Sequence, residues 1–305
     1  MAVKLNEDKA VVERIKKGLK EKGPVVSGLM NGLMNFSYGI KKLTKLNPGK
    51  VLLKPVLEKA NISTLRVAIC GGGPLASSVF KGYNSMGINF IQGYGLTETS
   101  PIITLNPIEK FKIESVGRSF TPYSEIKILN PDENGIGEIC AKGPMIMKGY
   151  YNMPEETAKM FTEDGWLKTG DIGKIDKEHY VYLCGRAKNL IVTAGGKNVY
   201  PEEIEDAFQL CDDVQQIVVQ GYANTEDETA EEIEALIYPS DSLYEELGQK
   251  REESYNSPEV TARIQSEVSK VNKTLQPYAR ITRVTILENP LEMTTTKKIK
   301  RNYKK

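Results

Sequence analysis

The chain has 305 residues, which is enough for two domains that each bury a sizeable core. Charged residues make up 27% of the sequence and apolar residues 40%, as in ordinary globular proteins rather than disordered ones. The net charge of +1 provides no general attraction to nucleic acid, and the sequence contains no nucleic-acid-binding motif. It has no apolar run of about 18 residues and no signal-peptide pattern. We therefore expect a soluble cytoplasmic protein, with peripheral contact to a membrane left open.

The amino-terminal residues 4–45 predict a helix, with apolar Val11, Ile15 and Leu19 on one face and lysines elsewhere. A basic amphipathic helix can lie on anionic lipid. We favour the simpler interpretation, in which the lysines form the solvated side of a packed helix. These lysines are Lys9, Lys16, Lys17 and Lys20.

A βαβ unit is predicted at residues 61–105. Residues 65–70 and 88–92 are short apolar runs typical of buried strands, and the helical spacing of apolar residues over 75–86 separates them. Such a connection makes the two strands parallel. Thr97 and Glu98 follow the second strand, at the end of the sheet where open α/β sheets bind ligands.

The residues after this strand favour two interpretations equally. A hydroxyl beside a carboxylate in a glycine-flanked loop suits a phosphate oxygen and its Mg²⁺ ion. Alternatively, Thr97 or Thr99 only caps a turn.

Residues 115–185 predict an antiparallel β-rich subdomain, with a distorted barrel as one arrangement. Turn residues separate strands at 124–129 and 137–142, and again at 166–175 and 180–184, so each pair forms a hairpin. The single histidine, His179, lies in the second turn with no partners for a catalytic triad or zinc site.

Beyond Arg186 the pattern predicts a compact α+β domain. Its expected strands and helices are strands 190–193, 216–222, 233–238 and 281–287 and helices 201–211 and 258–275. The acidic stretches 225–234 and 245–253 are most simply solvated loops or helix faces. The domain boundary is expected at 185–188. The four cysteines are widely spaced and form no CxxC pair, which favours reduced core thiols. They are Cys70, Cys140, Cys184 and Cys211.

Four motifs in order along the chain give it a family resemblance. They are residues 93–101, Thr169-Gly170-Asp171, Gly185-Arg186-Ala187-Lys188 and the terminal Lys297-Lys298-Ile299-Lys300-Arg301. From about residue 60 onward the chain resembles the acyl-adenylate-forming (AMP-binding) superfamily, and within it the bacterial long-chain fatty acid–CoA ligases. The resemblance implies ATP-dependent activation of a fatty acid to acyl-AMP and transfer to CoA, with ATP, Mg²⁺ and CoA required.

The resemblance also implies a fold class and domain organisation. Residues 1–185 would be the C-terminal part of the large AMP-binding domain, α/β with a β-rich subdomain. Residues 186–305 would form a small mobile α+β domain, with a hinge at Lys188.

The same resemblance assigns nucleotide-binding roles in the first part of the chain. Gly72 and Gly73 would let the backbone approach the adenine, and Tyr94 would lie against its ring. Gly95 belongs to the same nucleotide-binding set. Thr97 would bond the α-phosphate, and Glu98 would bind Mg²⁺.

Further roles follow for the later motifs. Asp171 would accept the ribose hydroxyls, and Arg186 would donate to ribose or phosphate oxygens. Gly195 and Gly196 would leave room for the pantetheine arm of CoA. Each has a plainer alternative: a turn at Asp171, a surface ion pair for Arg186 and a tight turn at the glycine pair.

The terminal lysine-rich run resembles the family's last motif, in which a lysine bridges the carboxylate and α-phosphate oxygens. Spacing to Ile299 and Arg301 assigns this role to Lys298, although Lys297 replaces the family's usual glycine. The alternative is a basic, disordered terminus.

No stretch before residue 60 resembles the family's phosphate-binding loop. We therefore expect a C-terminal fragment of a longer enzyme, one that adenylates poorly alone. Two other functions stay open: an adenylating enzyme that passes its acyl group to a carrier protein, and an inactive nucleotide-binding or interaction fragment. Acyl chain length and oligomeric state are not indicated.

Overall fold

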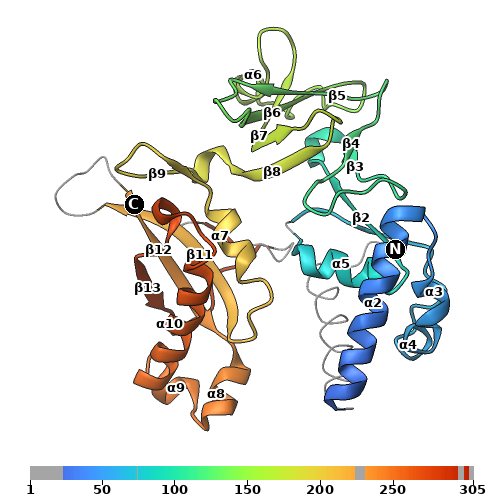
Figure 1. Ribbon diagram of the computed structural model, residues 1–305. Coiled ribbons are helices and arrows are strands. Elements are labelled where there is room, and N and C mark those ends of the chain that lie inside the picture. The colour runs from blue at the N-terminus through green and yellow to red at the C-terminus, as the bar shows by residue number, and fades with distance from the viewer. Residues whose placement is uncertain (1–22, 74, 224–230, 295–298, 302–305) are drawn as a thin grey trace. The chain divides into compact units, whose positions relative to one another are not determined.

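The computed structural model describes residues 23–73, 75–223, 231–294 and 299–301 (Figure 1). The chain divides into two compact units, Met1–Leu183 and Cys184–Lys305. We call these the first unit and the second unit. None of the helices in the described ranges is long and apolar enough to cross a bilayer.

The predicted βαβ unit is present in the first unit. Strand β1 (Val67–Cys70) leads through helix α5 (Ser77–Ser85) to strand β2 (Asn89–Tyr94). The two strands pair in parallel, with Cys70 opposite Gln92, as the crossover connection predicts. Because β2 continues to Tyr94, two residues beyond the expected end, this tyrosine is fixed by the sheet and not by a loop.

Aromatic packing joins helix α5 to the sheet. The Phe90 ring stacks on Tyr83 with centroids 4.6 Å apart and meets Phe80 edge-on at 6.1 Å. All three side chains are buried, so each contributes roughly 1.5–3 kcal/mol of hydrophobic stabilisation. This packing fixes α5 against the first residues of β2, the strand that leads to the candidate site.

The expectation of one helix over 4–45 is partly wrong, because α2 (Pro24–Thr44), which packs against α5 (Figure 1), begins after Gly23, whose φ of 93° is not helical. Residues 4–22 of the predicted helix lie outside the described residues. Lys41 of α2 is buried, unlike the solvated lysines expected on this helix. The ammonium donates to Asn84 Oδ1 at 2.8 Å and to the Ile88 carbonyl at 3.1 Å, and burial lowers its pKa to about 8. The expected solvated lysines lie outside the described residues, at Lys9, Lys16, Lys17 and Lys20.

The β-rich region contains both predicted hairpins. Four strands form one sheet in chain order, β5 (Glu125–Leu129), β6 (Gly137–Lys142), β7 (Leu167–Ile175) and β8 (Val181–Arg186). The other elements of this unit are α3 (Gly49–Leu52), α4 (Lys54–Lys59), β3 (Thr104–Leu105), β4 (Arg118–Ser119) and α6 (Pro154–Lys159). His179 is exposed in the turn before β8 with a φ of 65°, as its position in a hairpin turn suggests.

The buried core of this region includes Tyr94 itself. The ring packs with apolar side chains from β6, β8 and the segment after β2, namely Ile103, Val116, Ile139, Ala141 and Val181. A residue at the end of the parallel sheet is thereby locked against the antiparallel sheet. This packing brings β2 close to β7, which carries Asp171.

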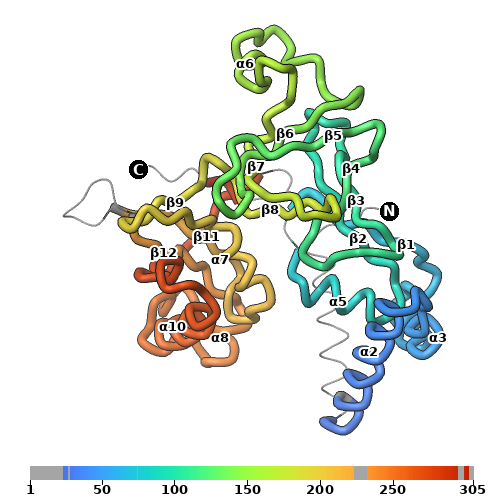
Figure 2. The backbone as a smooth tube through the Cα atoms, turned by 45° about the horizontal axis from the view of Figure 1, so that its top comes forward, coloured from blue at the N-terminus to red at the C-terminus, as the bar shows by residue number. Residues whose placement is uncertain are grey.

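The second unit is the predicted α+β domain. Helices α7, α8 and α10 share a core with a three-stranded sheet ordered β11-β12-β13 (Figure 1). Figure 2 shows α7, α8 and α10 beside β11 and β12. The strands are β9 (Ile191–Val192), β10 (Asn198–Val199), β11 (Val214–Ala223), β12 (Glu231–Pro239) and β13 (Arg283–Ile286). The helices are α7 (Pro201–Ala207), α8 (Asp241–Leu247), α9 (Arg251–Ser254) and α10 (Pro258–Asn272).

One expectation for this unit is partly wrong. The acidic stretch 225–234 is not all solvated loop, because its last residues lie in β12 and Glu234 is buried. Arg283 on the adjacent parallel strand donates to both Glu234 oxygens, at 2.8 and 2.9 Å. A buried carboxylate is tolerated when a fork of donors satisfies it, which the local sequence does not reveal.

Candidate nucleotide-binding site

The turn after β2 depends on glycine. A Cβ on Gly95 would lie 1.8 Å from the Pro101 carbonyl oxygen, so no other residue fits. The short 3₁₀ helix η1 (Thr97–Thr99) follows. The buried Thr99 hydroxyl accepts from the Leu96 amide at 2.8 Å and donates to the Pro101 carbonyl at 2.7 Å. The capping alternative is therefore correct for Thr99, and Thr97 is exposed at the surface of the turn.

Tyr94 and Asp171 form the central contact of the site. The tyrosine hydroxyl donates to Asp171 Oδ2 at 2.7 Å, joining the end of β2 to β7 across 77 residues of sequence. Tyr94 is 7% exposed, while Asp171 is half-buried. The structure thus brings together two residues that the sequence placed in separate motifs.

The backbone around Asp171 is held by its own motif. The buried Thr169 hydroxyl donates to the Ile139 carbonyl at 2.7 Å and accepts from the Asp171 amide at 3.1 Å. Gly170 has a φ of +71°, a conformation that favours glycine, and its amide donates to Glu138 Oε1 at 3.0 Å. At each position of the threonine–glycine–aspartate motif, a different structural requirement therefore explains the residue type.

Glu98 is held by two contacts from one segment. The Tyr150 hydroxyl donates to Glu98 Oε1 at 2.8 Å, and the Met147 amide donates to the Glu98 carbonyl at 2.8 Å. The hydrogen bond to the carboxylate is the main reason why the pKa of Tyr150 is raised. Sequence reasoning missed Tyr150, because the two side chains are 52 residues apart and no local pattern links them.

The glycines after β1 behave differently from each other. Gly72 has a φ of +84° and is exposed, and a Cβ there would meet no heavy atom within 4 Å. Backbone conformation, not crowding, is thus the reason for glycine at this position. Gly73 is half-buried beside it. The resulting bare backbone at the end of β1 is compatible with close approach by a planar ring.

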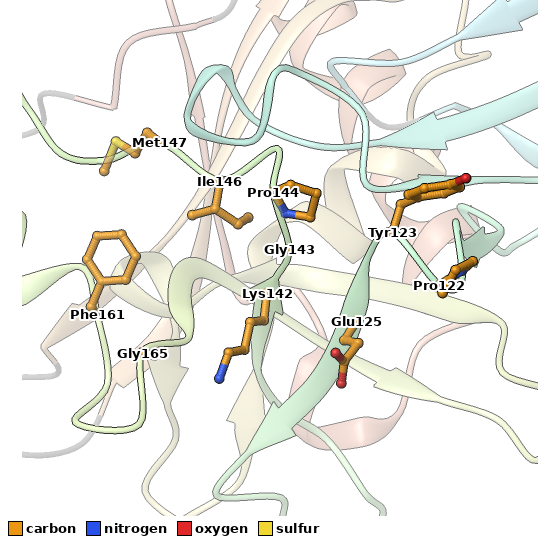
Figure 3. A pocket seen from close by; sticks show the side chains of 10 residues that line it. All are labelled: Pro122, Tyr123, Glu125, Lys142, Gly143, Pro144, Ile146, Met147, Phe161 and Gly165. Atoms are coloured by element: carbon orange, nitrogen blue, oxygen red, sulfur yellow. The ribbon is translucent and has the colours of Figure 1, made fainter.

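A hollow of about 470 Å³ lies beside the segment that carries Met147 (Figure 3). Its lining is mixed, with apolar side chains and the charged Glu125 and Lys142. Lys142 Nζ also lies 5.7 Å from the centre of the Trp166 ring. The lining residues are Pro122, Tyr123, Glu125, Lys142, Gly143, Pro144, Ile146, Met147, Phe161 and Gly165.

The second unit carries the remaining described candidates. Arg186 ends β8 and is half-buried, and Lys188 is exposed in the short 3₁₀ helix η2 (Ala187–Asn189). Gly195 and Gly196 form the turn between β9 and β10, where the Gly196 amide donates to the Thr193 carbonyl at 2.8 Å. The tight-turn alternative therefore describes the glycine pair, and its exposed backbone stays compatible with a ligand role.

The proposed adenylating lysine, Lys298, lies outside the described residues. On its C-terminal side, Ile299 forms an antiparallel bridge with Met293. Arg301 then donates to Glu205 Oε2 at 2.5 Å and to the Val219 carbonyl at 3.2 Å. The described end of the chain is thus paired and anchored, which argues against a wholly disordered basic terminus.

The donor chemistry of the first unit fits a magnesium ion bound together with phosphates. Mg²⁺ prefers hard oxygen ligands and is usually held by one or two carboxylates plus substrate phosphates. Glu98 supplies such a carboxylate beside the exposed Thr97 hydroxyl. Within the described ranges, no cluster of three or more His, Cys, Asp or Glu side chains could hold a metal ion without such phosphates.

Two family models match consecutive parts of the chain. Residues 9–151 match the AMP-binding enzymes, and residues 188–304 match the AMP-binding enzyme C-terminal domain. The chain therefore belongs to the AMP-binding family of adenylate-forming enzymes, as its four motifs predict.

Curated relatives include ligases that act on different acids. The chain is 32% identical over 249 residues to a long-chain-fatty-acid–CoA ligase of Mycobacterium bovis, covering 77% of this chain and 39% of the relative. It is 39% identical over 228 residues to the 2-succinylbenzoate–CoA ligase of Oceanobacillus iheyensis, covering 66% and 47%. The chain thus spans less than half the length of these relatives.

Solved structures support the same fold. The Bacillus subtilis O-succinylbenzoate coenzyme A synthetase in complex with ATP and magnesium is similar to this chain, with a TM-score of 0.64 and 27% identity. The match covers 83% of this chain and 49% of that one. ATP-bound MatB from Rhodopseudomonas palustris gives a TM-score of 0.62 at 27% identity, covering 83% and 48%.

Proposed function

We propose that this chain is the nucleotide-binding and C-terminal portion of an AMP-forming acid–CoA ligase whose substrate is a long-chain fatty acid. The observation that carries the proposal is the Tyr94–Asp171 hydrogen bond beside the Glu98–Tyr150 pair. These contacts bring together, within one unit, the hydroxyl of the buried Tyr94, a carboxylate that would take the ribose and a carboxylate that would take a cation. These are the groups that an adenylate needs around it.

In the proposed reaction a carboxylate oxygen of the acid attacks the α-phosphorus of ATP, and pyrophosphate leaves. This step requires positioning and charge neutralisation more than covalent help from the protein. Asp171 would accept the ribose hydroxyls, with Oδ2 already oriented by Tyr94. Thr97 would donate to the α-phosphate from the exposed side of η1.

Magnesium, when bound, would neutralise the charge of the phosphates as pyrophosphate departs. Glu98 would hold it through the carboxylate. Lys298 would neutralise the same developing charge, and Arg186 would donate to ribose or phosphate. Gly72 and Gly73, as bare backbone, would line the adenine.

In the second proposed step the thiol of CoA attacks the acyl carbonyl, and AMP leaves. The turn at Gly195 and Gly196 would leave room for the pantetheine arm of CoA, because it carries no side chains. Lys188, exposed in η2, would act as the hinge between the two steps.

The substrate class has one competitor within the same chemistry. The identity of 39% to a 2-succinylbenzoate–CoA ligase favours an aromatic acid as the second candidate. Long-chain ligases among the relatives favour the fatty acid, as does the basic terminal motif.

Calorimetric titration of the chain with two non-hydrolysable adenylates tests this proposal. One analogue carries a hexadecanoyl group and the other a succinylbenzoyl group. We expect tighter binding of the hexadecanoyl analogue, and loss of binding of both in Asp171→Asn. Asp212→Asn is the matched control, because Asp212 is exposed in the second unit. Preference for the aryl analogue would shift the function to the second candidate, and unchanged binding by Asp171→Asn would refute the site.

A further inference from the structure

A segment of the first unit that belongs to none of the four motifs contacts Glu98. Residues 147–150 contact it twice, through the Met147 amide to its carbonyl and through the Tyr150 hydroxyl to its carboxylate. The first contact fixes the backbone of η1, and the second fixes the side chain. Together they determine where the carboxylate points.

Residues 147–150 are themselves held by helix α6 and the residue before it. The Tyr150 amide donates to Thr157 Oγ1 at 2.9 Å, and this hydroxyl donates to the Met153 carbonyl at 2.8 Å. Gly149 has a φ of +151°, and a Cβ there would lie 2.7 Å from Thr157 Cγ2. The backbone before Tyr150 is therefore restricted to one conformation. This restriction positions the Tyr150 hydroxyl for its hydrogen bond to Glu98.

We propose that Tyr150 is a positioning residue for the cation site: its hydroxyl occupies Oε1 of Glu98 and leaves Oε2 oriented toward the magnesium ion of the bound nucleotide. This proposal rests on the proposed function, which assigns Glu98 to the cation.

The chemistry of a phenol suits this role better than a cation would. A neutral hydroxyl satisfies one carboxylate oxygen and restricts its rotamer while leaving the negative charge intact for the metal. A lysine or arginine in the same place would compete with Mg²⁺ for the charge. Partners that orient metal-binding carboxylates affect metal affinity strongly when they are removed, by about 10–100-fold in known metal sites.

The next residue provides a matched control. Tyr151 is 90% exposed, whereas Tyr150 is half-buried against Glu98. The variants Tyr150→Phe and Tyr151→Phe thus delete the same atom from adjacent positions. Only the first removes a donor from the carboxylate.

The experiment measures binding of Mn²⁺·ATP to the full chain from the enhanced water-proton relaxation of protein-bound Mn²⁺, with Mn²⁺·ATP without protein as the reference, together with thermal unfolding. We expect Tyr150→Phe to weaken Mn²⁺ binding by about 5–10-fold, since one hydrogen bond to a charged group is lost. Tyr151→Phe should bind as wild type. Thr157→Val should weaken binding in the same direction by a smaller factor, which keeps the proposal testable if Tyr150→Phe does not fold.

The variant Glu98→Gln separates this inference from the proposed function. If Glu98→Gln loses Mn²⁺ binding while Tyr150→Phe keeps it, the cation role of Glu98 stands and the positioning role of Tyr150 is wrong. If Tyr150→Phe lowers the unfolding temperature but leaves Mn²⁺ affinity unchanged, the hydroxyl only supports the fold and the inference is again wrong. Unchanged binding in Glu98→Gln would refute both.

Discussion

The tyrosine–aspartate pair shows how one hydroxyl can serve both fold and ligand. Tyr94 is buried in the core between two sheets, yet its polar atom reaches Asp171 at 2.7 Å. An aromatic ring with a polar end is suited to such a position. The ring secures β2, and the hydroxyl orients the carboxylate proposed to take the ribose.

Removing this hydroxyl should weaken nucleotide binding more than it weakens the fold. We expect Tyr94→Phe to bind the hexadecanoyl-adenylate analogue about 3–10-fold more weakly, because a hydrogen bond to a charged group is lost. Calorimetry measures the affinity, and Tyr278→Phe, at a half-exposed tyrosine, is the control. Unaltered affinity in Tyr94→Phe would show that Asp171 needs no orientation.

Two carboxylates on α7 should make the second unit sensitive to pH. Burial raises the pKa of Glu205 to about 7, against the opposing effect of Arg301, and raises that of Asp206 to about 7. A raised pKa in the folded state means that the proton stabilises the fold. That stabilisation is complete below the unfolded pKa and is lost as pH rises through about 7.

The variant Asp206→Asn should remove part of this dependence. An amide keeps the shape of the side chain but takes no charge, so we expect the variant to gain on the order of 1–2 kcal/mol over wild type at pH 8 and little at pH 4. Denaturant unfolding at both pH values measures the gain, with Asp212→Asn at an exposed position as the control. An equal gain at both pH values would argue against a buried, titrating Asp206.

At the scale of elements, the turn between β2 and β3 is determined by one glycine. Because a Cβ on Gly95 would overlap the Pro101 carbonyl, Gly95→Ala must move the backbone that carries Thr97 and Glu98. We expect a loss of about 3 kcal/mol or more in stability together with weaker Mn²⁺·ATP binding. Thermal unfolding tests it against Gly39→Ala, in helix α2, where a Cβ meets nothing within 4 Å. A Gly95→Ala protein as stable as wild type would contradict the steric argument.

The C-terminal segment should be released when its anchor is removed. Arg301 pairs with Glu205 and contacts the Val219 carbonyl, so Arg301→Ala leaves a half-buried carboxylate without its ionic partner. We expect a loss of about 1–3 kcal/mol and faster trypsin cleavage after Lys300. Mass spectrometry of timed digests measures the cleavage, and Arg280→Ala at an exposed position is the control. Equal digestion rates would mean that the ion pair does not hold the segment.

Elements were predictable from the sequence where their signal is local. Apolar runs bounded by turn residues located β1, β5, β6 and β7 to within one or two residues, and the crossover rule gave the parallel pairing. Long-range partners were not predictable. The Glu98 carboxylate meets Tyr150, 52 residues away, and Glu205 meets Arg301, 96 residues away. Nothing in a window of residues encodes such a contact.

At the scale of the whole molecule, each of the two units contains a core of its own. The second unit buries a continuous apolar cluster drawn from α7, α8, α10 and the β11–β13 sheet. The chain divides between Leu183 and Cys184, whereas the change of pattern in the sequence places a domain boundary at 185–188. The predicted domain organisation remains a prediction, based on the change of residue pattern along the chain.

The second unit should therefore fold when produced alone. We expect residues 184–305 to unfold in one cooperative transition with the circular dichroism of an α+β domain. Variant Ile264→Ala, in the buried face of α10, should lower its midpoint, with a loss of about 2–5 kcal/mol. A broad, non-cooperative transition in the isolated unit would show that its core depends on the rest of the chain.

Ligand binding in the hollow beside Met147 can be followed by intrinsic tryptophan fluorescence. Trp166 is the single tryptophan of the chain, and the ammonium of Lys142, which lines the hollow, lies over its ring. Indole emission shifts when a nearby charge moves. A molecule that enters the hollow and displaces Lys142 would therefore shift the wavelength of Trp166 emission in the unlabelled protein. Compounds that bind the hollow can thus be screened by tryptophan fluorescence.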